Sequence, residues 1–333
     1  MQEARFYEKQ DGHKVWCRLC PQSCHIEPGQ AGVCRVRRNA DGALYSLNYG
    51  QVSSVGVDPI EKKPLYHFYP GSQVLSVGTF GCNFNCGFCQ NWQIAHGDPD
   101  TREVSPEELV ASAVLARERS DSIGIAFTYS EPLVWYEYVY DTARLAREQG
   151  LKNVLVTNGS IREEPLLELL PLIDAMNIDV KGFAEGYYRE TCRGRLGPVK
   201  QTVELAHTRC HVEITTLLVP TLNDSDGEIA ALVDWLAGLN PEIPIHFSRY
   251  FPQYQLDLPP TPLATLRRAR EIARRKLKYV YIGNAPELGA GNTSCPACGN
   301  LLIERTGYRT RLQGLEHGIC SKCGARIPII GGN

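Results

Sequence analysis

The chain has 333 residues, of which 43% are hydrophobic and 22% are charged, an ordinary globular composition that excludes long disorder, collagen and coiled coil. A formal net charge of -2 argues against binding to nucleic acid or to an anionic membrane that is dominated by electrostatics. No apolar stretch approaches the ~20 residues of a membrane-spanning helix, and the charged start is unlike a signal peptide, so we expect a cytoplasmic protein.

Cysteine is the unusual residue of this sequence. The chain contains 13 cysteines, and all but Cys192 and Cys210 fall into three tight clusters. In a reducing compartment, clusters of this kind are more often metal ligands than disulfides. The sequence therefore predicts metal sites in three places along the chain.

The first cluster lies in a turn-rich segment, residues 1–72, which we expect to bind metal. Its four cysteines have spacings of two, three and nine residues: Cys17, Cys20, Cys24 and Cys34. Four thiolates could close a zinc site, or they could hold a fully ligated iron–sulfur cluster for electron transfer. His25 could replace one of the sulfurs. A structural metal is the simpler interpretation.

Strand-like and helix-like segments alternate over residues 73–288. The expected strands are 74–80, 123–128, 153–157, 173–180, 212–219, 243–250 and 279–282, and the expected helices begin near 105, 134, 164, 227 and 261. Ser105 and Glu108 form a capping box at one helix start. Repeated βα units predict an α/β fold with a parallel sheet, in a partial or full (β/α) barrel. In such barrels the chemistry lies at the carboxyl ends of the strands, where His246 and Arg249 could face the site.

Three cysteines directly follow the first expected strand of this barrel, at Cys82, Cys86 and Cys89. A [4Fe–4S] cluster normally takes four thiolates, so a cluster on this loop would leave one iron without a local protein ligand. An open coordination position distinguishes a catalytic metal site from a closed structural one. This spacing therefore predicts a catalytic iron–sulfur site.

The last cluster forms a small C-terminal module, residues 289–333. Two Cys-x2-Cys-Gly turns are separated by 21 residues, and their cysteines are Cys295, Cys298, Cys320 and Cys323. Two such turns complete a closed tetrahedral site, which is the pattern of a zinc ribbon. A rubredoxin-like iron site uses similar turns, and Zn²⁺ is the favoured metal. Metal binding should supply much of the folding energy of this module.

The loop Cys82–Cys89, with aromatic Phe88 before its third cysteine, resembles the signature of the radical S-adenosylmethionine (SAM) enzymes. The resemblance implies that the open iron binds the amino and carboxylate groups of SAM. One-electron reduction would then cleave SAM to a 5′-deoxyadenosyl radical. It also implies a SAM site at four residues that follow later strands: Glu131, Asn158, Asp179 and Lys181.

A narrower resemblance rests on Asp58–Leu65, Cys89–Trp92 and Tyr281–Asn284. These segments are similar to the radical SAM member of the AmmeMemoRadiSam system, which is related to pyruvate formate-lyase activating enzymes. The resemblance implies an oxidoreductase with an external electron donor and with Memo-like and AMMECR-type protein partners. One alternative is an activase that abstracts hydrogen from glycine in a partner protein. The other is a non-enzymatic iron–sulfur and zinc scaffold that binds protein or RNA, which would need neither the open iron nor the polar strand ends.

Overall fold

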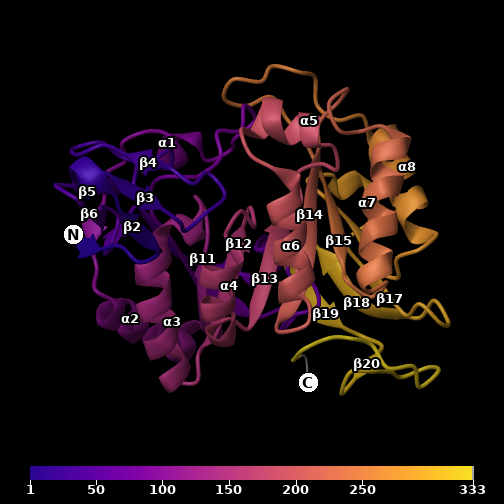
Figure 1. The fold of residues 1–333 in the computed structure, drawn as a ribbon. Coiled ribbons are helices and arrows are strands. Elements are labelled where there is room, and N and C mark those ends of the chain that lie inside the picture. Colours follow the sequence, from indigo (N-terminus) through magenta and orange to yellow (C-terminus); the bar gives the residue numbers. More distant parts are fainter. Residues whose placement is uncertain (332–333) are drawn as a thin grey trace.

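One eight-stranded sheet organises the computed structural model, which describes residues 1–331 (Figure 1). Its order is β16-β15-β14-β13-β12-β11-β9-β8, and all neighbours are parallel except β8, which pairs antiparallel with β9. The strands are β8 (Ser54–Pro59), β9 (Gln73–Gly78), β11 (Ser122–Phe127), β12 (Lys152–Thr157), β13 (Ala175–Asp179), β14 (His211–Leu218), β15 (Ile245–Arg249) and β16 (Val280–Gly283). Within the described residues, the edge strands β8 and β16 do not pair with each other, so the barrel is partial. A partial barrel is one of the two forms that the sequence predicts.

Helices connect the parallel strands and cover the outer face of the sheet (Figure 1). They are α1 (Trp92–Ala95), α2 (Pro106–Ser120), α3 (Tyr136–Glu148), α4 (Glu163–Leu169), α5 (Glu185–Tyr187), α6 (Leu196–Ala206), α7 (Asp226–Leu239) and α8 (Leu263–Arg274). The predicted capping box is confirmed, because Ser105 Oγ accepts from the Glu108 N–H while Glu108 accepts from the Ser105 N–H. No helix in residues 1–331 combines the length and apolar character that a membrane crossing requires.

The N-terminal segment forms small sheets beside the β9 end of the barrel. Their strands are β1 (Gln2–Glu3), β2 (Tyr7–Lys9), β3 (Val15–Cys17), β4 (His25–Ile26), β5 (Arg37–Ala40), β6 (Ala43–Ser46) and β7 (Gln51–Val52). The short strand β10 (Arg102–Glu103), from the connection between β9 and β11, pairs with β7. A buried ion pair ties this segment to α3, with Arg37 Nη2 3.0 Å from Glu137 Oε1 and both side chains at most 3% exposed. The segment is therefore packed into the barrel wall.

The C-terminal strands are β17 (Thr293–Ser294), β18 (Leu301–Thr306), β19 (Arg309–Leu312), β20 (Leu315–Glu316) and β21 (Ile319–Cys320). They contact both open edges of the barrel. On the β16 side, the Tyr281 hydroxyl lies 2.8 Å from Thr293 Oγ1. On the β8 side, Arg305 pairs with Glu61 at 3.5 Å and donates to the Tyr66 carbonyl at 2.7 Å. The C-terminal strands thus bridge the two unpaired edges.

Candidate active site

A cavity of about 630 Å³ lies inside the partial barrel and reaches the carboxyl ends of its strands. This volume falls within the range of roughly 300–1,000 Å³ that is common for small-molecule sites. All seven residues that the sequence assigns to the cluster and to SAM line it: Cys82, Cys86, Cys89, Glu131, Asn158, Asp179 and Lys181. The fold therefore brings together residues that span a hundred positions of the chain.

The three-cysteine loop is held in place from two sides. At Gly81 the backbone φ is +90°, and a Cβ there would lie 2.8 Å from the Cys34 carbonyl oxygen, so this position requires glycine. On the opposite side, the Asn85 N–H donates to the Cys192 carbonyl at 3.0 Å, and the Gly87 N–H donates to the Thr191 carbonyl at 3.2 Å. These backbone contacts fix the loop independently of its cysteine side chains.

The thiols of this loop fit an iron–sulfur cluster better than a single ion. Ligand atoms of a single metal ion lie close together. Among residues 1–331, only the C-terminal cysteines place at least three ligand atoms within 4.8 Å of one another. The sulfurs of Cys82, Cys86 and Cys89 are therefore spread more widely than one ion requires. N–H groups point at one sulfur, with the Phe84 N–H 3.4 Å and Asn158 Nδ2 3.7 Å from Cys82 Sγ. Burial raises the pKa of Cys89 to about 11, so a bound metal would have to displace the thiol proton.

Glu131 is the centre of a buried hydrogen-bond network. Its carboxylate accepts from Thr157 Oγ1 at 2.6 Å and from the Asn158 N–H at 2.8 Å. Burial raises the pKa of Glu131 to about 7, although these hydrogen bonds act in the opposite direction. Asn158 also donates to Asn83 Oδ1 at 2.9 Å, beside Cys82. One network thus joins the predicted SAM-binding carboxylate to the cysteine loop.

Asp179 and Lys181 form an ion pair at the end of β13. Lys181 Nζ lies 3.0 Å from Asp179 Oδ2, and its backbone N–H donates to the Tyr188 hydroxyl at 3.0 Å. Burial alone would lower the pKa of Lys181, but the Asp179 carboxylate and the nearby Cys86 sulfur raise it well above its ordinary value. Lys181 is therefore a fixed positive charge beside the cysteine loop.

His246 faces the cavity and Arg249 does not line it. His246 Nε2 lies 2.7 Å from Glu213 Oε2, and Glu213 is fully buried. Arg249 instead donates to the Thr261 carbonyl at 2.9 Å and pairs with Glu287 at 3.0 Å. The structure thus separates two residues that the strand pattern had placed together, and it adds Glu213 as the partner of the histidine.

A second cavity-lining group was missed by the sequence reasoning. Lys63 is 2% exposed, and its Nζ lies 2.7 Å from Asp58 Oδ2, which also accepts from the Tyr129 hydroxyl at 2.8 Å. Tyr308, on the turn between β18 and β19, lines the same cavity. The charges in Asp58–Leu65 resemble a solvated surface run, and only the segment's position between β8 and β9 shows that Lys63 is buried.

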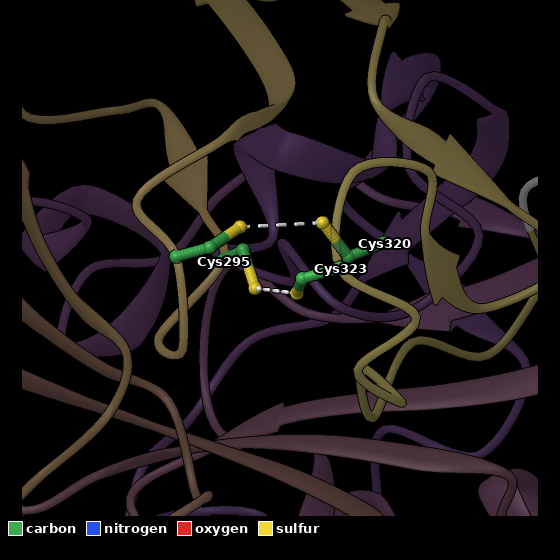
Figure 2. Close-up of side chains that lie close together, drawn as sticks. Cys295, Cys320 and Cys323 are labelled. Carbon is green, nitrogen blue, oxygen red and sulfur yellow. Dashed lines mark hydrogen bonds between the residues drawn. The ribbon is translucent and has the colours of Figure 1, made fainter.

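The C-terminal cysteines converge as a tetrahedral metal site requires. Cys295 Sγ lies 3.6 Å from Cys323 Sγ, and Cys298 Sγ lies 3.7 Å from Cys320 Sγ. Figure 2 shows the sulfurs of the two turns pointing toward one another. Zinc–thiolate bonds of about 2.3 Å give sulfur–sulfur edges of roughly 3.8 Å, so these side chains already have the spacing that one ion needs. This group could bind a metal, as the sequence predicts.

The N-terminal cysteines surround a separate small cavity, which Cys17, Cys20, Cys24 and Cys34 all line. His25 does not line it. The His25 side chain is exposed, and its Nδ1 lies 2.9 Å from Gln10 Oε1. Because alternate residues of a strand point to opposite faces, His25 in β4 points away from the cavity that the neighbouring Ile26 lines.

The chain is similar to known proteins in sequence and in structure. Residues 76–235 match the family model described as Radical SAM superfamily. An uncharacterized protein of Methanocaldococcus jannaschii is 48% identical and covers 99% of this chain and 100% of its own length. A pyruvate formate-lyase-activating enzyme of Clostridium pasteurianum is 29% identical over 49% of this chain and 70% of its own. Among solved structures, a radical SAM methyltransferase from Sphaerobacter thermophilus has a TM-score of 0.52 at 19% identity, covering 70% of this chain and 71% of its own.

Proposed function

Because the chain belongs to the radical SAM superfamily, we propose that Cys82, Cys86 and Cys89 hold a [4Fe–4S] cluster that cleaves SAM reductively to a 5′-deoxyadenosyl radical. The family implies both cofactors, and the chain is an enzyme of radical chemistry. The observation that carries the proposal is the single cavity lined by three thiols and the polar ends of β12 and β13. The radical would abstract hydrogen from a substrate in the same cavity.

Four residues would bind SAM, each with a defined chemical role. Glu131 is held by the Asn158 N–H, and its ionised form would accept a hydrogen bond from the amino group of the methionine moiety. Lys181 offers a positive charge close to Cys86, which suits the methionine carboxylate. Asp179 would keep Lys181 in position through their 3.0 Å contact. The chain would thereby orient SAM. The cluster would pass on the electron from the external donor, and the bond that is cleaved belongs to SAM itself.

The remainder of the cavity would hold the substrate. Its wall carries His246, which pairs with the buried Glu213, and Lys63, which pairs with Asp58. Tyr308 closes the wall from the C-terminal strands. Such a mixture of fixed charges and aromatic surface suits a polar small molecule or a modified side chain.

The proposal extends to partners and organisation. An external one-electron donor is required by radical SAM chemistry, and the segments Asp58–Leu65 and Tyr281–Asn284 favour Memo-like and AMMECR-type protein partners of one shared system. We assign residues 1–72 to a metal-binding segment whose last strand, β8, joins the barrel sheet, 73–288 to the rest of the barrel and 289–333 to a zinc-ribbon-like module. Zn²⁺ is our proposed ion for the C-terminal cysteines, and the cytoplasm is our proposed location.

Anaerobic incubation with partner proteins tests this function. The reconstituted protein, SAM and dithionite should form 5′-deoxyadenosine, measured by mass spectrometry, and addition of the true partners should increase the yield. A stable glycyl radical in a partner, detected by electron paramagnetic resonance, would favour the activase, for which the similarity to the Clostridium pasteurianum enzyme is the supporting observation. No 5′-deoxyadenosine from a protein with verified cluster content would contradict the proposal.

A further inference from the structure

The N-terminal cysteines enclose a cavity of their own beside the barrel. Cys17 ends β3, Cys20 and Cys24 lie on the following turn, and Cys34 precedes β5. All four line a cavity of about 10 Å³, which is room for roughly one water molecule. Apolar side chains complete much of its wall: Leu19, Ile26 and Val134. A largely buried space with four thiols and a partly apolar wall is suited to an inorganic group.

The spacing of these thiols favours a cluster over a zinc ion. Four thiolates around one zinc lie roughly 3.8 Å apart, and the C-terminal group has this spacing, with sulfur–sulfur distances of 3.6 and 3.7 Å. Within the described residues, no three of the N-terminal thiols meet the 4.8 Å spacing that the C-terminal thiols satisfy. The N-terminal thiols are therefore more widely spaced than those of the C-terminal group. That arrangement fits the larger core of an iron–sulfur cluster, which four cysteines ligate completely.

The N-terminal cavity touches the loop that carries the catalytic thiols. Asn83 lines it, and Gln22 Nε2 donates to the Asn83 carbonyl at 2.7 Å. Gly81 packs so closely on Cys34 that a Cβ would lie 2.8 Å from its carbonyl oxygen. Both neighbours of Cys82 in the sequence therefore contact the N-terminal site. The segments that carry the two sets of thiols are therefore in direct contact.

The immediate surroundings are also suited to a redox group. The Val33 N–H points at Cys24 Sγ from 3.5 Å, which is a contact that stabilises a thiolate ligand. Arg37 lines the cavity and is neutralised by Glu137, with Nη2–Oε1 at 3.0 Å. Cys24 is half-buried and Val33 is 57% exposed, so one side of the site lies near the surface. The opposite side faces the catalytic loop.

We propose that Cys17, Cys20, Cys24 and Cys34 hold an auxiliary [4Fe–4S] cluster that passes electrons to the catalytic cluster. The electron-transfer part rests on the proposed function. A low-potential one-electron donor protein of the flavodoxin class would reduce the auxiliary cluster by one electron at the Cys24 side. That electron then moves to the catalytic cluster, so the auxiliary cluster returns to its oxidised state and no bond is made or broken there.

The decisive variant removes the catalytic thiols and leaves the N-terminal site intact: Cys82→Ala, Cys86→Ala and Cys89→Ala together. Wild-type protein should bind about eight iron and eight sulfide per chain, and the triple variant about four of each, since each cluster is held by its own cysteine set. The signal of the reduced triple variant in electron paramagnetic resonance should not change when SAM is added. Cys210→Ser is the matched control and should retain all of the iron.

A second variant tests the direction of electron flow. Cys20→Ala should lose half of the iron and should show slower reduction of the catalytic cluster by reduced flavodoxin, with the same end point under dithionite. A triple variant without iron but with a second zinc would overturn the cluster assignment. If flavodoxin reduces the catalytic cluster of Cys20→Ala at the wild-type rate, the electron-transfer role is overturned. Failure of the wild type to cleave SAM at full iron content would contradict the proposed function alone and leave the auxiliary cluster in place.

Discussion

The Glu131 carboxylate accepts a hydrogen bond from the Asn158 backbone N–H at 2.8 Å, across the ends of two adjacent strands, β11 and β12. The Asn158 side chain in turn lies 3.7 Å from the Cys82 sulfur. A group proposed to bind the amino end of SAM is therefore coupled to a proposed cluster ligand through one asparagine. SAM binding through this carboxylate would depend on the protonation state of Glu131.

SAM affinity should weaken as the pH falls through about 7. Burial raises the pKa of Glu131 to about 7, so below that pH the carboxyl is protonated in the free protein. The amino group of SAM would donate a hydrogen bond to the ionised form, so binding below this pH must first release the proton of Glu131. The dissociation constant should rise by up to about tenfold per pH unit below the pKa. Isothermal titration calorimetry of the reconstituted protein between about pH 6 and about pH 8 measures this dependence.

Glu131→Gln provides the control for this dependence. It keeps the size of the side chain and removes its charge, so SAM should bind more weakly and its affinity should follow pH less steeply than in the wild type, where only the SAM amino group would still titrate. Equal wild-type affinities at the two ends of the range would contradict the assigned role of Glu131.

Arg305→Met should destabilise the protein by about 3–5 kcal/mol, because it leaves a buried carboxylate without its partner. Arg305 is 1% exposed in its side chain, and Glu61 is fully buried. The pair joins the C-terminal strands to the segment after β8, so the loss should also loosen the Tyr308 side of the cavity. Urea unfolding monitored by tryptophan fluorescence gives the free energy. The double variant with Glu61→Gln should recover part of the loss, and a single-variant loss below about 1 kcal/mol would contradict this role of the pair.

The C-terminal cysteines should bind one zinc ion per chain with four sulfur ligands. X-ray absorption at the zinc edge should give zinc–sulfur distances of about 2.3 Å. Cys298→Ser should lose this metal and lower the melting temperature, because the module contacts both open edges of the barrel. Cys210→Ser, which changes an isolated cysteine, should alter neither property. Iron with a rubredoxin-type visible spectrum in place of zinc would contradict the assignment.

The sequence predicted the parts of this fold that local patterns determine. The strand ending at Thr157 and the helix beginning after Ser105 were predicted within one residue, because apolar runs and capping residues act locally. The helix Leu196–Ala206 was missed, since the side chain before it makes no capping hydrogen bond and its first turn contains glycine and proline. The antiparallel strand Ser54–Pro59 was missed because only one of its six residues is buried, so it carries no buried apolar run.

The parts of the site that the sequence could not predict depend on contacts between distant segments. Cys82, Glu131 and Lys181 were recognised because each directly follows a strand or lies in a known motif. Lys63 was not, because a buried lysine and a surface lysine have the same local sequence, and only its pairing with Asp58 in the folded chain distinguishes them. The position of the N-terminal thiols next to the catalytic loop depends likewise on contacts between distant segments.

The most direct test of the account compares Cys86→Ala with Cys192→Ala. The two cysteines are buried neighbours, with Cys86 Sγ 4.0 Å from the Cys192 carbonyl oxygen, but only Cys86 belongs to the proposed ligand set. Each variant is reconstituted anaerobically and given SAM and dithionite, and 5′-deoxyadenosine is measured by mass spectrometry. The account predicts that Cys86→Ala forms none while Cys192→Ala forms it as the wild type does. Product from Cys86→Ala at the wild-type rate would contradict the assignment of the catalytic cluster.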